Sequence, residues 1–275
     1  MTPAVKLSMP FVIIAGCLLV TSHFAEDGFY GRIAIPFVIG AAICYILAPQ
    51  INWRFYLKNP PKMDPGLHRL LETKVEFYQA MHPFERKKFR DRVMLFIEAV
   101  DFKAQVSDEF PSDMKICIAC SAVRLLQGRG DYFFPKFENI ILYPHPFPSP
   151  QFPENWHVSE IFEEDGVVLF AAKPLLLGFL TPKKYYDIAL HEYAKVYRIS
   201  YPNLDYPDLQ ENLWTELEKI SGFSKEIITK SIGLPAIELW PVAVVHFFVY
   251  PKRFQSALPD LFRKMDAVFQ TKLMD

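Results

Sequence analysis

The sequence predicts an α+β protein in which a helix-rich domain with a small sheet follows a two-helix transmembrane hairpin. Two runs near the N-terminus, residues 7–25 and 33–53, contain no Asp, Glu, Lys or Arg. After these runs, apolar residues recur at helical spacing in several segments, such as residues 67–81. Only short segments, residues 139–143 and 166–172, are rich in β-forming residues. Helices therefore dominate and strands are few.

The two uncharged runs have the length that a membrane span requires, since roughly twenty apolar residues cross a bilayer as a helix. A cleaved signal peptide is the alternative interpretation of the first run. However, no A-x-A cleavage pattern follows that run, and a second apolar run comes directly after it. We therefore expect residues 1–54 to form a retained transmembrane hairpin.

Flanking cations predict the orientation of this hairpin. Lys6 precedes the first run, and Arg54, Lys58 and Lys62 follow the second, whereas the connecting loop at 26–32 has one cation. Cytoplasmic flanks carry the excess of Lys and Arg. Both ends are therefore expected in the cytoplasm, with the large domain on the cytoplasmic face of an inner or plasma membrane.

The rest of the chain divides into a proline-rich linker, residues 55–65, and a folded domain, residues 66–275. Pro83 suits the first turn of a helix that runs to about residue 100. Further helices are expected at 113–127, 182–199, 208–220 and 238–274, with breaks in the last at Pro251 and Pro259. Strands are expected at 139–143 and 166–172.

Composition narrows the function classes. The net charge is -1, and no basic face is evident, which argues against a nucleic-acid partner. Cys117 and Cys120 form a single C-x-x-C inside a helical pattern, which favours two small buried thiols over a redox or metal site.

Residues 188–195, IALHEYAK, nearly match the zinc-binding pattern H-E-x-x-H. In that pattern two histidines four residues apart bind zinc on one helix face, and the glutamate activates the metal-bound water. His191 and Glu192 are present, but Lys195 stands where the second histidine is required. Taken alone, this segment is also compatible with an ordinary amphipathic helix.

Several segments together resemble the Mlc titration factor family of zinc-dependent peptidases, whose catalytic core is related to that of the anthrax lethal factor peptidase. The resemblance spans residues 67–272 and rests on the order and spacing of HPFERKKF at 82–89, the apolar helix at 113–128, IILYP at 140–144, GVVL at 166–169 and ELWPVAVVHFF at 238–248. It implies a zincin-like domain.

The resemblance also implies roles for individual residues. His191 falls on the first zinc ligand, Glu192 on the general base and Glu238 on a later glutamate ligand. Lys195 replaces the second zinc histidine, and this argues against zinc because an ammonium is not a metal ligand. We expect the ammonium to take the place of the cation. His246 is either a replacement ligand or a histidine of the aromatic core.

Three functions stay open at this stage. The first is a membrane-anchored, peptidase-like protein that has lost catalysis and binds a peptide or protein as a regulator. The second is an active zinc metallopeptidase with an altered ligand set, and the third is a structural or assembly protein of the inner membrane. For either of the first two, residues Gly166, Val167, Val168 and Leu169 are expected to hold an extended peptide at a sheet edge above the His191 helix.

Overall fold

A computed structural model describes residues 1–25, 28–107 and 109–271 of the chain. The chain forms two compact units, Met1–Pro61 and Lys62–Asp275. Each unit is described by itself below.

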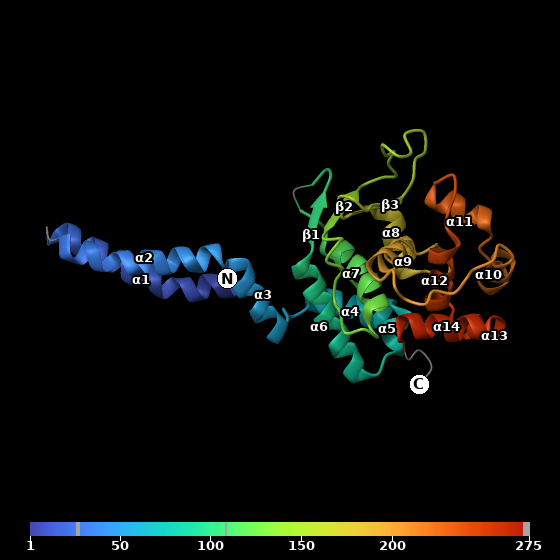
Figure 1. The fold of residues 1–275 in the computed structure, drawn as a ribbon, viewed down its shortest axis with the longest axis horizontal. Coiled ribbons are helices and arrows are strands. Elements are labelled where there is room, and N and C mark those ends of the chain that lie inside the picture. The colour runs from blue at the N-terminus through green and yellow to red at the C-terminus, as the bar shows by residue number, and fades with distance from the viewer. Residues whose placement is uncertain (26–27, 108, 272–275) are drawn as a thin grey trace. The chain divides into compact units, whose positions relative to one another are not determined.

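The first unit is a pair of long apolar helices followed by a short one: α1 (Pro3–Phe24), α2 (Gly28–Ile46) and α3 (Ala48–Lys58). Helices α1 and α2 pack side by side (Figure 1). Their mean hydropathies are 2.0 and 1.7, and most of their surface is exposed within the unit. By length and composition, both helices can cross a membrane. Residues 26 and 27 of the predicted connecting loop lie outside the described residues.

The second apolar run does not form one continuous helix, and the span predicted at 33–53 is wrong in its bounds. Helix α2 starts at Gly28 and ends at Ile46, and α3 begins at Ala48 with a proline in its first turn. Pro49 has no N–H to donate to the preceding helix, and its ring clashes with the carbonyl four residues earlier, at Tyr45, which separates the two helices. The Ala4 N–H donates to Asn52 Oδ1 at 2.8 Å, so α3 is fastened to the start of α1.

The second unit contains a four-stranded sheet in the order β1-β2-β4-β3. Strands β1 (Asp101–Ala104), β2 (Asn139–Tyr143) and β4 (Val167–Ala171) are parallel, and β3 (Ser159–Phe162) is antiparallel to β4. Val168 of β4 lies opposite Ile140 of β2 on one side and Ile161 of β3 on the other. This central position explains why four of the five β4 residues are buried.

The expectation that residues 166–172 form an edge strand is therefore wrong. Strand β3, which sequence reasoning missed, occupies the edge beyond β4. The two strands are joined by a tight turn that ends at Gly166, whose φ is +61°. An Asp-Gly pair between two β-forming segments is a strong hairpin signal, and Asp165 and Gly166 supply it here.

Eleven helices are described in the second unit, and they account for most of its residues, which confirms the predicted α+β class. They are α4 (Pro65–Lys74), α5 (Glu76–Ala80), α6 (Pro83–Ala99), α7 (Ser112–Leu126), α8 (Ala172–Leu180), α9 (Ile188–Ser200), α10 (Leu213–Ser221), α11 (Lys225–Ile232), α12 (Leu239–Val249), α13 (Pro251–Ala257) and α14 (Pro259–Phe269). The breaks predicted at Pro251 and Pro259 are confirmed. The predicted end of the last helix, at residues 272–274, lies outside the described residues.

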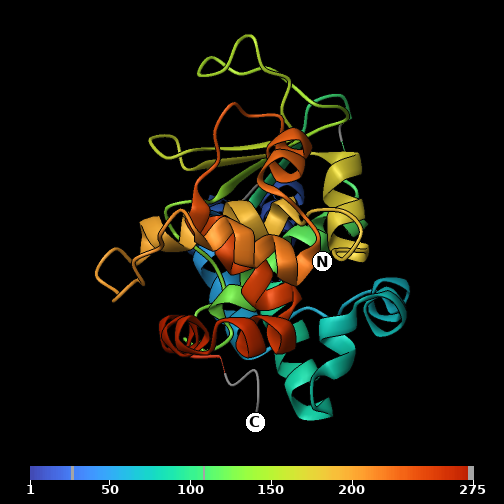
Figure 2. The ribbon, with the colours of Figure 1, turned by 90° about the vertical axis from the view of Figure 1, so that its right-hand side faces the viewer.

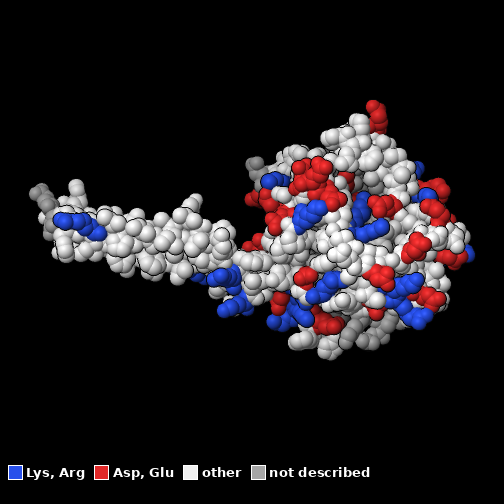
Figure 3. All heavy atoms as spheres, in the orientation of Figure 1, with Lys and Arg blue, Asp and Glu red and all other residues white. Residues whose placement is uncertain are grey.

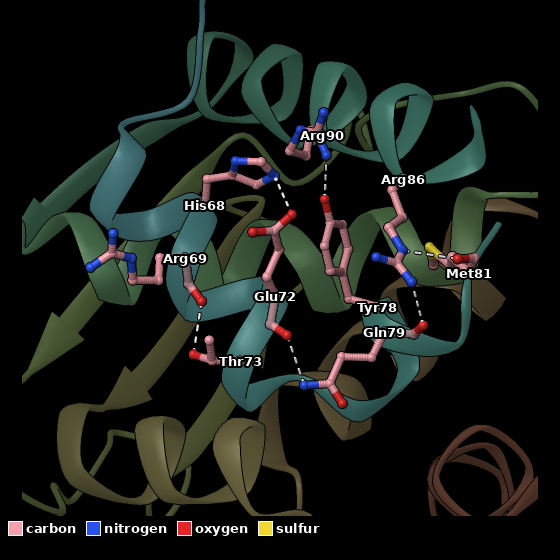
Figure 4. A network of polar contacts seen from close by, with 9 residues as sticks. All are labelled: His68, Arg69, Glu72, Thr73, Tyr78, Gln79, Met81, Arg86 and Arg90. Carbon is pink, nitrogen blue, oxygen red and sulfur yellow. Dashed lines mark hydrogen bonds and ion pairs between the residues drawn. The ribbon is translucent and has the colours of Figure 1, made fainter. Parts of the chain in front are cut away.

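Hydrogen bonds to backbone carbonyls hold the corner formed by α4, α5 and α6 (Figure 4). The Arg86 guanidinium donates to the carbonyls of Met81 at 2.9 Å and Gln79 at 2.6 Å. The Gln79 side chain donates to the Glu72 carbonyl at 2.9 Å. These carbonyls lie at helix ends, where no intrahelical donor is available to them.

Helices α7 and α12 form the apolar centre of the second unit, and α9 packs against both of them (Figures 1 and 2). Cys117 and Cys120 on α7 are buried free thiols, as predicted. Burial raises the pKa of both thiols, so they stay protonated and serve as small apolar side chains.

Candidate functional site

Helix α9 is an interior helix with a buried polar start. Its N-cap residue, Asp187, accepts a hydrogen bond from the Leu190 N–H at 2.9 Å. Burial raises the pKa of Asp187, and the nearby guanidinium of Arg124 partly opposes this shift. Arg124 is itself buried, which lowers its pKa to about 10, and it donates to the Phe248 carbonyl of α12 at 2.5 Å. The start of α9 is thus fixed by polar contacts inside the domain.

Glu192 is a completely buried carboxylate with a partner on each side. Its Oε1 accepts from the Ser159 hydroxyl of β3 at 2.7 Å. Its Oε2 lies 2.8 Å from Lys195 Nζ, with side-chain exposures of 0% for Glu192 and 16% for Lys195. The second contact lacks hydrogen-bond alignment and is therefore mainly ionic. The ammonium supplies the positive charge that a buried carboxylate needs.

His191 is buried beside this ion pair and is neutral. Burial, followed by the charge of Lys195, lowers the pKa of His191 well below its usual value. The ring Nδ1 lies 2.8 Å from the Tyr186 hydroxyl, and burial raises the pKa of that phenol, which keeps it protonated. Nε2 is buried and has no hydrogen-bond partner among the described residues.

The direction of the Tyr186–His191 hydrogen bond decides which ring nitrogen of His191 carries the proton. If Tyr186 donates to Nδ1, the imidazole proton sits on Nε2, and Nε2 cannot bind a metal. If Nδ1 donates to the Tyr186 oxygen, Nε2 presents a lone pair. The hydrogen bond therefore controls whether His191 is a candidate ligand.

Glu238 is the N-cap residue of α12, and Pro241 follows three residues later in the first turn of that helix. Its side chain is 65% exposed, and its Oε2 lies 3.9 Å from Arg198 Nη1. Arg198 is two helical turns beyond His191 on α9, a rise of about 10 Å. Within the described parts of the chain, Glu238 makes no hydrogen bond or ion pair with His191, Glu192 or Lys195.

The described side chains do not fit the three-ligand zinc site that the resemblance implies. A catalytic zinc site presents three protein ligands and leaves one position for water. Here His191 is joined by Lys195 instead of a second histidine, and Glu238 pairs with Arg198. No group of three His, Cys, Asp or Glu side chains that could hold a metal ion occurs in the described ranges.

His246 has a different role from the replacement ligand considered above. Its Nδ1 lies 2.7 Å from the Val242 carbonyl, and its Nε2 lies 2.8 Å from the Ser221 hydroxyl. Both ring nitrogens are therefore engaged, and burial lowers the pKa of His246 to about 4. It is a neutral histidine of the core.

Sequence reasoning missed the polar residues of the edge strand β3. Ser159 faces α9 and Glu192, whereas the next residue, Glu160, pairs with His157 Nε2 at 3.0 Å. His157 Nδ1 lies 2.9 Å from the Asn155 carbonyl, so the ring is held at both nitrogens. These contacts anchor the edge strand beside the helix that carries His191 and Glu192. The sequence offers no motif that would have singled out these residues.

Fold and site together describe a metallopeptidase-like protein: an interior helix carries the His-Glu pair next to an antiparallel edge strand. Residues 51–197 match the model of a family described as glucose-regulated metallo-peptidase M90. The chain belongs to this family, which confirms the resemblance over those residues. The matched region includes His191, Glu192 and Lys195, and it ends before Glu238.

A weaker similarity exists to a protein of Synechocystis sp. that is described only as uncharacterized. The two chains are 23% identical over 119 residues, which cover 43% of this chain and 40% of that protein. The chain thus matches less than half the length of this relative.

Proposed function

We propose that this chain is a membrane-anchored, peptidase-like protein in which the Lys195 ammonium takes the place of the metal ion. The main support for this proposal is the 2.8 Å contact between Lys195 Nζ and Glu192 Oε2. In this proposal the protein binds a peptide or protein segment and does not hydrolyse it.

The state of Glu192 supports the loss of catalysis. A general base needs a free oxygen within reach of the proton that it abstracts. Both Glu192 oxygens are engaged, one by the Ser159 hydroxyl and the other by the Lys195 ammonium. A divalent cation beside His191 would also be repelled by Lys195. The substitution of one residue thus acts against the base and against the metal.

The position of β3 supports the binding role. Among the strands of the described residues, β3 pairs with β4 alone, so its outer side is an edge of the sheet. An extended peptide can add to such an edge through backbone hydrogen bonds. Because β4 is central, Gly166, Val167, Val168 and Leu169 would support β3 from behind and would not touch the peptide through their backbone.

The membrane anchor is part of the same proposal. Residues 1–54 would form the hairpin, 55–65 the linker and 66–275 the binding domain in the cytoplasm. The supporting observations are the two apolar helices and the cations at Lys6, Arg54 and Lys58. Reporter fusions at residue 28 and at the C-terminus test it, and an external C-terminal reporter would refute the orientation.

The central experiment compares zinc content and peptide cleavage in the wild type, Lys195→His and Lys195→Gln. We expect no stoichiometric zinc in the wild type or in Lys195→Gln, which removes the charge without adding a ligand. Lys195→His should bind zinc, because it supplies a second histidine on the correct helix face. Glu238 would have to leave Arg198 to join this site, and its exposed ion pair with Arg198 would oppose that move only weakly.

Two results separate the possibilities. Adding Glu238→Gln to Lys195→His should weaken zinc binding if Glu238 is the third ligand. Stoichiometric zinc together with chelator-sensitive cleavage in the wild type would overturn the proposal.

One observation favours the second candidate, an active zinc metallopeptidase with an altered ligand set. Within the described ranges, His191 Nε2 is buried without a hydrogen-bond partner, and a buried polar atom in that state is costly unless something binds it. The zinc analysis of the wild type decides between the two candidates.

A further inference from the structure

A groove in the first unit lies where the start of α1 meets α3. It has a volume of about 740 Å³, and its apolar lining includes Leu7, Ile51 and Phe55. The Ala4–Asn52 hydrogen bond holds α3 in place beside α1 at this point. The groove is therefore built within the first unit.

Three cations also line this groove: Lys6, Arg54 and Lys58. All three are exposed, and none forms an ion pair within the described residues. In the sequence of the first unit, the only carboxylates are Glu26 and Asp27, which follow the opposite end of α1. Helix α1 itself has 22 residues and is about 33 Å long.

The distribution of charge along the hairpin is visible in Figure 3. The shaft formed by α1 and α2 carries no charged side chains over most of its length, and Lys and Arg lie at its two ends, one of which is the end where α3 lies. If the shaft spans a bilayer, this end lies at the level of the lipid headgroups. Helix α3 also contains Trp53 and Tyr56, residue types that are enriched at that level.

We propose that this groove binds one phospholipid with an anionic headgroup. Lys6, Arg54 and Lys58 would hold the phosphate, which a guanidinium recognises well. The acyl chains would lie along Leu7 and Ile51 towards the shaft. The combination of an apolar wall and unpaired cations fits an anionic amphiphile better than a free inorganic anion. The inference rests on the membrane anchor of the proposed function.

The test uses the full chain in lipid nanodiscs that contain phosphatidylglycerol and phosphatidylcholine, followed by native mass spectrometry. We expect one saturable phosphatidylglycerol to be retained in preference to phosphatidylcholine. Each of Lys6→Gln, Arg54→Gln and Lys58→Gln should weaken this preference about fivefold, which corresponds to about 1 kcal/mol per cation near an anionic surface. Excess inorganic phosphate should not displace the lipid.

Arg32→Gln is the matched control, because Arg32 is a cation of the same hairpin at the opposite end. An equal effect of Arg32→Gln would indicate diffuse attraction and overturn the site. Displacement of the lipid by phosphate would also overturn the site. Extraction of membranes with alkaline carbonate shows whether the chain is embedded in the bilayer. If the chain resists this extraction but retains both lipids equally, the site is likewise overturned. If carbonate removes the wild-type chain from the membrane, the membrane anchor is overturned, and this inference with it.

Discussion

Replacing Lys195 by Met would leave the Glu192 carboxylate buried without its cation. Removing one partner of a buried ion pair costs about 3–5 kcal/mol, because the remaining charge is uncompensated. Two features place the cost of Lys195→Met near the lower end of this range. The Ser159 hydroxyl still donates to Oε1, and the 16% exposure of the Lys195 side chain shows that water is close. We expect the free energy of unfolding to fall by about 3 kcal/mol.

The measurement is urea unfolding of the full chain in a non-ionic detergent, followed by near-UV circular dichroism, which reports on the buried aromatic residues of the second unit. Lys219→Met is the matched control. Lys219 lies 2.8 Å from Glu216 with the same spacing of three residues, but their side chains are 65% and 41% exposed. An exposed pair contributes at most about 1 kcal/mol.

A double variant separates charge balance from packing. In Lys195→Met combined with Glu192→Gln, no charge is left buried, so most of the lost stability should return. If Lys195→Met costs no more than Lys219→Met, Lys195 does not balance a buried carboxylate. The Lys195 ammonium would then not take the place of a metal ion beside Glu192.

Two further predictions concern the second unit. Burial lowers the pKa of His246 to about 4, so the folded state resists protonation of this ring. The contribution of His246 to stability is complete above pH 6.5 and falls by about 3 kcal/mol as the pH drops to 4. In urea unfolding from pH 8 to 4, His246→Gln should lose this part of the slope and keep the part that comes from His191, whose pKa burial also lowers. An unchanged slope in His246→Gln would contradict this assignment. Gly166→Ala should reduce the unfolding free energy by at least about 2 kcal/mol in the same assay, because φ is +61° and the new Cβ would lie 2.2 Å from the Lys136 carbonyl oxygen. Gly222→Ala, at φ +82° with open space around it, should cost only the backbone strain of about 1 kcal/mol, and an equal loss in both variants would show that the close approach at Gly166 is unimportant.

Most of the correct predictions about the fold came from the helical spacing of apolar residues and from the positions of prolines. Helices α6 and α7 follow apolar stripes, and the last helices break where Pro251 and Pro259 remove a backbone donor. Helix α8 was missed because its residues are almost all apolar, and a short apolar run has no period that separates helix from strand. Strand β3 was missed because its polar residues are buried through contacts that sequence periodicity does not show, such as the contact of Ser159 with the distant Glu192.

The site was readable only where its residues are close in sequence. His191, Glu192 and Lys195 share one turn of helix, so their spacing predicts that they lie together. Ser159 reaches Glu192 from 33 residues away, and no local pattern marks it. The order of the strands is likewise a property of the packed sheet, which is why β4 was placed at the wrong position.

The location of Lys195 explains how one substitution can change the chemistry of the whole helix face. Position 195 is four residues after His191 and three after Glu192, so on a helix it neighbours both side chains. A histidine there could share a metal with His191, whereas the longer lysine stem reaches back to the carboxylate, as the 2.8 Å contact shows. The ion pair balances the charge of Glu192, but His191 Nε2 stays buried with no hydrogen-bond partner in the part of the chain that the structure describes. That unpartnered nitrogen makes zinc content the decisive measurement on this protein.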